Sequence, residues 1–238
     1  MARERDGRLA PVAAALDAAP APVSLFFRDD DAGWDDRRLL ELTGRFAVAD
    51  VPLDLAVIPA AITPALAAEL RDQPGLGLHQ HGFAHVNHEP EGRKCEFGPS
   101  RSAAQQRADI AAGRERLREL LGDALQPIFT PPWNRCTADT GRALAELGFR
   151  ALSREHRAEP LAVPGLSELP VHVDWVRLEP DELAARMAER IAAGGPLGVM
   201  LHHAVMEPES MERTSELLAL VADHEHATPR PMLELLRS

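Results

Sequence analysis

Four of the chain's ten histidines lie within ten positions, directly after a short apolar run. The segment reads His79-Gln80-His81-Gly82-Phe83-Ala84-His85, and His88 follows it. A spacing of four residues would place His81 and His85 on one face of a helical turn. Two imidazoles completed by a carboxylate suit zinc or a similar divalent ion, with positions left for water and substrate. The cluster therefore favours a metal site over isolated structural histidines, and His79 and His88 are either supporting groups or surface residues.

A run of three aspartates supplies the carboxylate that such a site needs. It stands at the end of an apolar segment, Phe26-Phe27-Arg28-Asp29-Asp30-Asp31. Adjacent carboxylates repel one another unless a positive group lies among them. The alternative is a solvated turn in which Asp31 or Asp35 begins the next helix. Together with the histidines, the run favours a metal ligand and a catalytic carboxylate.

Two later segments also carry candidate groups at the ends of expected strands. Thr130-Pro131-Pro132-Trp133-Asn134-Arg135 predicts a rigid loop, because proline fixes φ and lacks an N–H donor. A turn with a packed tryptophan is the simpler interpretation of this loop. Val199-Met200-Leu201-His202-His203 predicts a buried strand that ends in histidine. In a parallel barrel the active site lies at that end of the strands, although a core histidine bonded to a backbone carbonyl is the alternative.

Short apolar runs alternate with segments of helical periodicity along the chain. We expect strands at residues 23–27, 53–58, 76–79, 128–130, 149–152, 171–176 and 197–201. We expect helices at residues 35–49, 102–121, 137–147, 181–193 and 210–226, and one that begins at Thr63-Pro64. This alternation predicts an α/β fold with a parallel sheet. About seven or eight strand–helix units favour a distorted (β/α)7-8 TIM-like barrel over a doubly wound sheet.

Composition narrows the range of partners. The chain has 238 residues and a net charge of −11, so a nucleic acid or an anionic membrane surface is not an expected partner. One domain is expected over residues 1–238, with its core at about 23–236. No segment has the roughly 18 apolar residues that a membrane span needs. Residues 1–17 lack the apolar stretch of a signal peptide, and Cys95 and Cys136 fit reduced thiols, so a cytoplasmic protein is expected.

Two loops interrupt the pattern. Residues 82–100 form the longest segment without periodicity, and a loop of this length in a compact domain is usually functional. Residues 159–169, which contain Pro160, Pro164 and Gly165, are expected to form a second loop.

In this order, the segments resemble the motifs of the polysaccharide deacetylase family, metal-dependent carbohydrate esterases with a distorted (β/α) barrel. The resemblance covers residues 23–203. Arg28-Asp29-Asp30-Asp31 resembles the first motif, which implies that Asp29 is the catalytic base and Asp30 a metal ligand. The segment from His81 to His85 resembles the second motif, which implies that these two histidines are the other ligands.

Three further motifs complete the resemblance. Pro131-Pro132-Trp133 resembles the third, which implies that Pro132 and Trp133 form a wall of the substrate groove. Val173-Asp174-Trp175 is similar to the fourth, which implies that Asp174 orients a catalytic group and that Trp175 lines the site. The segment ending at His202 resembles the fifth, which implies that this histidine is the general acid.

The sequence departs from the family pattern at two positions. Thr130 stands where the family has an arginine that orients the base, and either Arg28 or Arg135 can replace that arginine. Asp31 stands where the family has a glycine. A register shifted by one residue would make Asp30 the base and Asp31 the ligand.

The resemblance implies metal-assisted amide hydrolysis that removes an acetyl group from an N-acetylated sugar or glycoconjugate. A divalent metal is the implied cofactor, with zinc as the default and other first-row ions as alternatives. A small-molecule or glycan substrate is the expected partner, and the oligomeric state is left open. One alternative is an amidohydrolase acting on a small non-sugar amide, with residues 82–100 as a lid over a closed pocket. The other is a metal-binding protein without catalysis.

Overall fold

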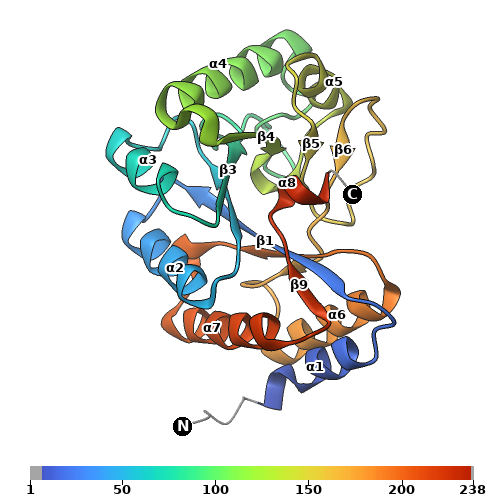
Figure 1. The fold of residues 1–238 in the computed structure, drawn as a ribbon. Helices are drawn as coiled ribbons and strands as arrows, with labels where there is room; N and C mark the ends of the chain where they lie inside the picture. Colours follow the sequence, from blue (N-terminus) through green and yellow to red (C-terminus); the bar gives the residue numbers. More distant parts are fainter. Residues whose placement is uncertain (1–6, 237–238) are drawn as a thin grey trace.

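The structure, a computed structural model that describes residues 7–236, contains a parallel sheet surrounded by helices (Figure 1). The strand order is β6-β5-β4-β3-β2-β1-β8-β7, and β9 pairs with β1. The sheet curls into the distorted TIM-like α/β barrel that the strand–helix alternation predicts. The strands are β1 (Val23–Ala32), β2 (Leu53–Val57), β3 (Leu76–His81), β4 (Leu125–Thr130), β5 (Ala151–Leu152), β6 (Ser167–Glu168), β7 (Val173–Asp174), β8 (Leu197–Leu201) and β9 (Ala227–Pro229).

The barrel is least regular between its two end strands. Both β6 and β7 are two residues long. An isolated bridge between Glu155 and Val171 joins the loop after β5 to the segment before β7. Strand β6 lies inside residues 159–169, which the sequence pattern predicts to be entirely a loop.

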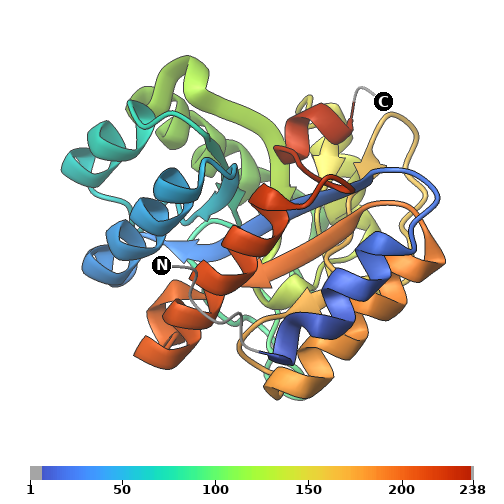
Figure 2. The same ribbon diagram turned by 60° about the horizontal axis from the view of Figure 1, so that its bottom comes forward.

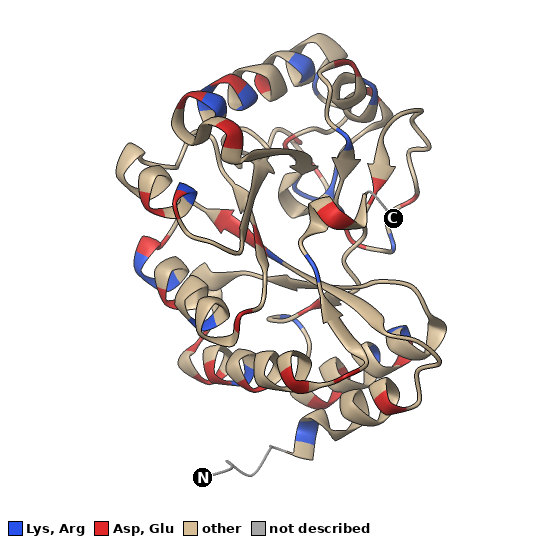
Figure 3. Ribbon diagram, in the orientation of Figure 1, with Lys and Arg blue, Asp and Glu red and all other residues tan. Residues whose placement is uncertain are grey.

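Helices cover the outside of the sheet, and their charged residues are spread over the surface (Figure 3). The helix α1 packs along α6, as Figure 2 shows. No helix within residues 7–236 has the length and apolar composition needed to cross a bilayer. The helices are α1 (Ala10–Asp17), α2 (Asp36–Ala49), α3 (Pro64–Arg71), α4 (Ala103–Leu121), α5 (Ala138–Glu146), α6 (Pro180–Ala193), α7 (Pro208–Asp223) and α8 (Met232–Leu235), with 3-10 turns η1 (Gly7–Leu9), η2 (Gly122–Ala124), η3 (Pro132–Asn134) and η4 (His203–Val205).

Side-chain caps begin several of these helices where the sequence places small polar residues. The Thr63 hydroxyl accepts a hydrogen bond from the Leu66 N–H, at the position predicted for the start of a helix. Ser102 and Thr137 form capping boxes at the starts of α4 and α5. Each cap satisfies backbone donors that have no partner within the helix.

Strand β1 separates two apolar regions. Leu25 and Phe27 belong to the core between sheet and helices, whereas Phe26 belongs to the cluster inside the barrel. Because side chains alternate along a strand, Arg28 and Asp30 share the inward direction of Phe26. The interior is therefore apolar at the start of β1 and charged toward its end.

The C-terminal helix α8 closes the apolar end of the barrel. Met232 is fully buried in the interior cluster, and its N–H donates to Asp54 Oδ2 at 2.9 Å. The other Asp54 oxygen is buried without a hydrogen-bond partner among the described residues. Burial raises the pKa of the Asp54 carboxyl to about 7, although the Met232 hydrogen bond works in the opposite direction.

Asp54→Asn is expected to remove a pH-dependent loss of stability. A carboxyl whose pKa is raised on folding binds its proton more tightly in the folded state, so stability falls as pH rises from about 4 to about 7. Asparagine retains an acceptor for Met232 and carries no charge. Urea unfolding at pH 5 and pH 8 should show the variant gaining about 1–4 kcal/mol relative to wild type at the higher pH. An equal difference at both values would contradict a raised pKa.

Candidate metal centre and active site

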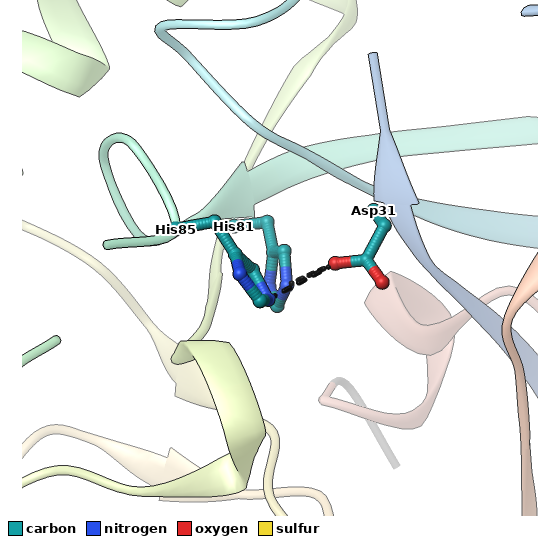
Figure 4. Close-up of side chains that lie close together, drawn as sticks. All are labelled: Asp31, His81 and His85. Atoms are coloured by element: carbon teal, nitrogen blue, oxygen red, sulfur yellow. Dashed lines mark hydrogen bonds and ion pairs between the residues drawn. The ribbon is translucent and has the colours of Figure 1, made fainter. Parts of the chain in front are cut away.

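Three side chains that could hold a metal ion converge at the carboxyl ends of β1 and β3 (Figure 4). Asp31 Oδ1 lies 3.2 Å from His81 Nε2 and 3.1 Å from His85 Nε2. His81 is buried, and the side chains of Asp31 and His85 retain 13% and 9% exposure. The three donors therefore face one small volume that remains open to solvent on one side.

The donor set fits a divalent ion. His81 Nδ1 lies 3.0 Å from the Thr130 carbonyl oxygen, which only accepts, so Nδ1 carries a proton and Nε2 is the nitrogen that would bind a cation between His81 and Asp31. Donor atoms about 2.0–2.2 Å from a tetrahedral zinc ion lie roughly 3.3 Å apart. The measured separations of 3.1 and 3.2 Å are close to that spacing. Two imidazoles and a carboxylate are a set that zinc and other first-row ions accept.

The electrostatics of the cluster favour a cation. Burial by itself raises the pKa of Asp31, but the hydrogen bonds and charges of His81 and His85 hold that pKa well below its ordinary value. For His81, burial lowers the pKa, and Asp31 and Asp30 together raise it above the ordinary value. Asp31 is therefore ionised at neutral pH, and a cation bound beside it would take the place of the proton that Asp31 stabilises on His81.

The two histidines meet through an irregular turn rather than the helical turn that their spacing suggests. His81 ends β3, while Gly82 and His85 both have left-handed backbones, with φ of 56° and 57°. Glu96 is buried beneath the turn and accepts hydrogen bonds from the N–H groups of Phe83 (3.1 Å) and Ala84 (2.8 Å). The loop over residues 82–100 thus folds back and fixes the position of His85.

A local irregularity in β1 decides which aspartate faces the histidines. Strict alternation would point Asp29 and Asp31 to the same side, away from Asp30. The pairing register with β2 shifts between Asp29 and Ala32, and Asp31 has φ of 73°. This bulge turns Asp31 toward His81 and His85, so Asp31 rather than Asp30 is the carboxylate next to the two histidines.

Asp30 instead pairs with Arg28 inside the barrel. Arg28 Nε lies 2.8 Å from Asp30 Oδ1, and Arg28 Nη2 lies 3.0 Å from Asp30 Oδ2. The guanidinium also donates to Ser153 Oγ (2.7 Å) and Asn134 Oδ1 (2.8 Å). Burial raises the pKa of Asp30, but the charge of Arg28, followed by those of His81 and His202, brings it below the ordinary value. Thr130 occupies the position at which the family pattern has an arginine beside the base. Of the two candidate replacements, Arg28 and Arg135, Arg28 is the one that binds Asp30.

Asp29 is fully buried on the other side of β1 and belongs to a separate pair. Its Oδ2 lies 2.6 Å from His203 Nδ1, and its Oδ1 accepts from the His203 N–H at 2.9 Å. His203 Nε2 lies 2.6 Å from the Trp34 carbonyl. Burial lowers the pKa of His203, but Asp29 outweighs it and raises the pKa to about 9. His203 is not singled out by the sequence, because nothing in the adjacent pair His202-His203 indicates which ring faces the core.

His202 faces the interior carboxylate. Its Nε2 lies 3.9 Å from Asp30 Oδ2, its side chain is 19% exposed, and its Nδ1 is buried without a partner among the described residues. Asp174, which the fourth motif pairs with the acid, contacts Arg177 at 3.3 Å and the Val176 N–H instead. The structure therefore gives His202 no orienting carboxylate from Asp174.

The two predicted groove tryptophans lie in different places. The Trp133 ring centroid is 4.4 Å from that of His85, on the turn η3 that begins at Pro132. Trp175 is 2% exposed, belongs to the core under the helices, and donates from its indole nitrogen to the Ser210 carbonyl. Trp133 can thus contact a molecule at the cluster, whereas Trp175 has no free surface there.

The sequence matches no protein-family model and no curated protein sequence. Among solved structures, a protein from Mycobacterium smegmatis assigned to the polysaccharide deacetylases has a TM-score of 0.74 at 18% identity, covering 92% of this chain and 91% of its own. A CE4 family pseudoenzyme from Bacillus anthracis has a TM-score of 0.64 at 14% identity, and the match covers 91% of this chain and 66% of the pseudoenzyme. A family 4 acetyl xylan esterase from Clostridium thermocellum, in complex with cobalt, has a TM-score of 0.54 at 14% identity, covering 83% and 82%. The chain therefore shares the fold of the family 4 carbohydrate esterases.

Gly82→Ala is expected to disrupt the turn that carries His85. A Cβ atom at Gly82 would lie 2.1 Å from Glu96 Oε2 and 2.6 Å from Pro132, whereas one at Gly92 would have no atom within 4 Å. Both glycines have positive φ, so Gly92→Ala is a control with similar backbone strain in the same loop. Chemical unfolding should show Gly82→Ala to be the less stable variant by about 1–3 kcal/mol. Equal stabilities would contradict the close packing of Gly82 against Glu96.

Proposed function

We propose that this chain belongs to the polysaccharide deacetylases and hydrolyses the acetyl group of an N-acetylated sugar or glycoconjugate with a divalent metal, zinc by default. The observation that carries the proposal is the convergence of Asp31, His81 and His85 beside a buried carboxylate, Asp30, that Arg28 holds in place. The fold shared with carbohydrate esterases supports the choice of a sugar substrate. The acetyl xylan esterase among these structures supports acetyl as the acyl group.

In this proposal Asp31, His81 and His85 hold the ion, Asp30 is the base and His202 is the acid. These roles follow from aligning the first motif one residue later, in place of the alignment that makes Asp29 the base and Asp30 the ligand. The contacts of Asp29 support the shift, because both of its oxygens are bound to His203 and it is fully buried. An ion held at this site would supply Lewis acidity, which activates a water molecule and polarises the acyl carbonyl.

The remaining chemistry comes from the side chains around the ion. Arg28 donates one hydrogen bond to each oxygen of Asp30, which leaves a second lone pair on each oxygen to accept the proton of the attacking water. His202 faces the same space, with Nε2 3.9 Å from Asp30 Oδ2, and can donate a proton to the departing amine. Trp133 covers His85 and limits the access of bulk water. The C–N bond breaks, and the products are an amine and acetate.

Metal affinity distinguishes Asp31 from Asp30 as the carboxylate ligand. Asp31→Asn and His85→Ala each remove a proposed ligand and should weaken zinc binding by more than the roughly 10- to 100-fold typical of losing an outer hydrogen-bond partner. Asp30→Asn should retain most of the affinity, and Asp36→Asn, an exposed site on α2, all of it. Competition against a chromophoric chelator measures the affinity. Loss of zinc binding in Asp30→Asn but not in Asp31→Asn would restore Asp30 as the ligand.

Activity tests the proposed base. Asp30→Asn should lower kcat for acetate release by about 10²–10⁴-fold, because the general base is lost while its shape is kept. The assay measures acetate from N-acetyl sugars, O-acetyl sugars and simple amides, using protein whose folding and metal content are verified. Asp36→Asn is the matched control. Unchanged turnover in metal-loaded Asp30→Asn would contradict the proposed base, and a preference for non-sugar amides would contradict the proposed substrate.

A further inference from the structure

A second cavity, of about 180 Å³, lies beside the candidate metal centre. Its walls come from the loop over residues 82–100, the turn after β4, the loop after β5, the segment from residue 171 to α6, and β8. Arg93, Trp133, Glu155, Asp174 and Met200 are examples from these parts, in the same order. None of the proposed metal ligands lines it. The cavity is therefore a separate compartment that adjoins the site.

The charge of this cavity is opposite to that of the chain. Five arginines line it, against two carboxylates, Glu155 and Asp174, so its formal charge is positive by three, in a protein of net charge −11. The arginines are Arg93, Arg135, Arg157, Arg177 and Arg186. Guanidinium groups gathered around one hollow create a positive potential that attracts an anion.

Ion pairs engage three of the five arginines, because Arg186 also pairs with Glu182, outside the cavity, at 3.1 Å. Among the described residues, Arg135 and Arg157 have no carboxylate within ion-pair distance. Arg93 lies 3.9 Å from Glu155, at the limit of an ion pair, and Arg177 lies 3.3 Å from Asp174. Arg135 donates to the Lys94 carbonyl oxygen, but its Nε is buried without a partner among the described residues. Burial lowers the pKa of Arg135, and the charge of Arg93 lowers it further.

The cavity shares side chains with the proposed active site. Trp133 lines the cavity and also covers His85 at 4.4 Å between ring centroids. Asn134 and Met200 line the cavity and contact Arg28, which holds Asp30. One ligand can therefore place its acetamido group at the metal cluster and another part of its structure in the cavity.

We propose that the cavity binds the phosphoryl or pyrophosphoryl group of the substrate, so that the enzyme deacetylates a phosphorylated amino sugar. This inference rests on the proposed function. Two arginines without a carboxylate partner, beside three that are paired, match a doubly charged phosphate better than a single carboxylate. The arginine fork binds phosphate oxygens in pairs, and no lysine lines the cavity. The volume of about 180 Å³ is that of roughly six water molecules, which is sufficient for such a group.

Direct binding of inorganic phosphate, measured by titration calorimetry on the full-length protein, tests the cavity independently of catalysis. Arg135→Gln and Arg157→Gln should each weaken binding about tenfold or more, the effect of losing a charge-assisted hydrogen bond. Arg37→Gln, an exposed arginine on α2 outside the cavity, is the matched control and should bind as wild type does. Arg157 is exposed on its loop, so its replacement should not disturb folding.

Turnover then tests the substrate assignment. The kcat/KM values for N-acetylglucosamine, its 1-phosphate and its uridine diphosphate conjugate should favour a phosphorylated form, and the cavity variants should reduce that preference. A preference for the 1-phosphate indicates a phosphoryl group, and a preference for the conjugate a pyrophosphoryl group.

Phosphate affinity that is unchanged in both cavity variants would overturn the inference, as would affinity that is lost only in His85→Ala, which would locate the anion at the metal cluster. In either case, deacetylation of the neutral sugar would leave the proposed function standing. Cavity binding without deacetylation of any probe would contradict the proposed function, and with it the substrate assignment.

Discussion

The buried ion pair between Arg28 and Asp30 organises the inside of this barrel. The Arg28 side chain is fully buried, and a charge in that position requires a partner and several hydrogen-bond acceptors. Asp30, Asn134 and Ser153 supply them from β1, from the turn after β4 and from the end of β5. The same contacts fix the carboxylate that we propose as base and the turn that carries Trp133. The hydrogen bonds that stabilise the buried Arg28 charge therefore also position the proposed base.

The three consecutive residues Asp29, Asp30 and Asp31 contact different partners because the backbone turns their side chains in different directions. Asp29 holds His203 against the Trp34 carbonyl outside the barrel wall, Asp30 holds Arg28 inside it, and Asp31 joins the two histidines at the rim. Each of the three neighbouring carboxylates has its own positive or hydrogen-bonding partner, which offsets the repulsion among them. The candidate metal centre lies beside a cavity lined by arginines. Our proposal of a substrate with both an acetamido group and an anion rests on that juxtaposition.

The fold was predictable because it depends on local patterns. Apolar runs of strand length alternate with segments of helical period, and the predicted strands and helices correspond to β1 to β5, β7, β8 and α2 to α7. The patterns missed β6 (Ser-Glu) and β9 (Ala-Thr-Pro), which do not lie in an apolar run, and α1 and α8, which lie outside the alternation. Strand β1 runs five residues beyond its apolar part, because its charged end is satisfied by partners from distant segments.

For the site, the sequence by itself determined which residue types gather at the strand ends: His81, His85, a run of aspartates and a histidine at the end of β8. It did not determine which aspartate faces the histidines, because that depends on a shift of register in β1 and a left-handed backbone at Asp31. It also left open which arginine supports the base, and it gave no sign of the Asp29–His203 pair or of the burial of Trp175. These features depend on contacts between residues far apart in the chain, so only the tertiary structure could decide them.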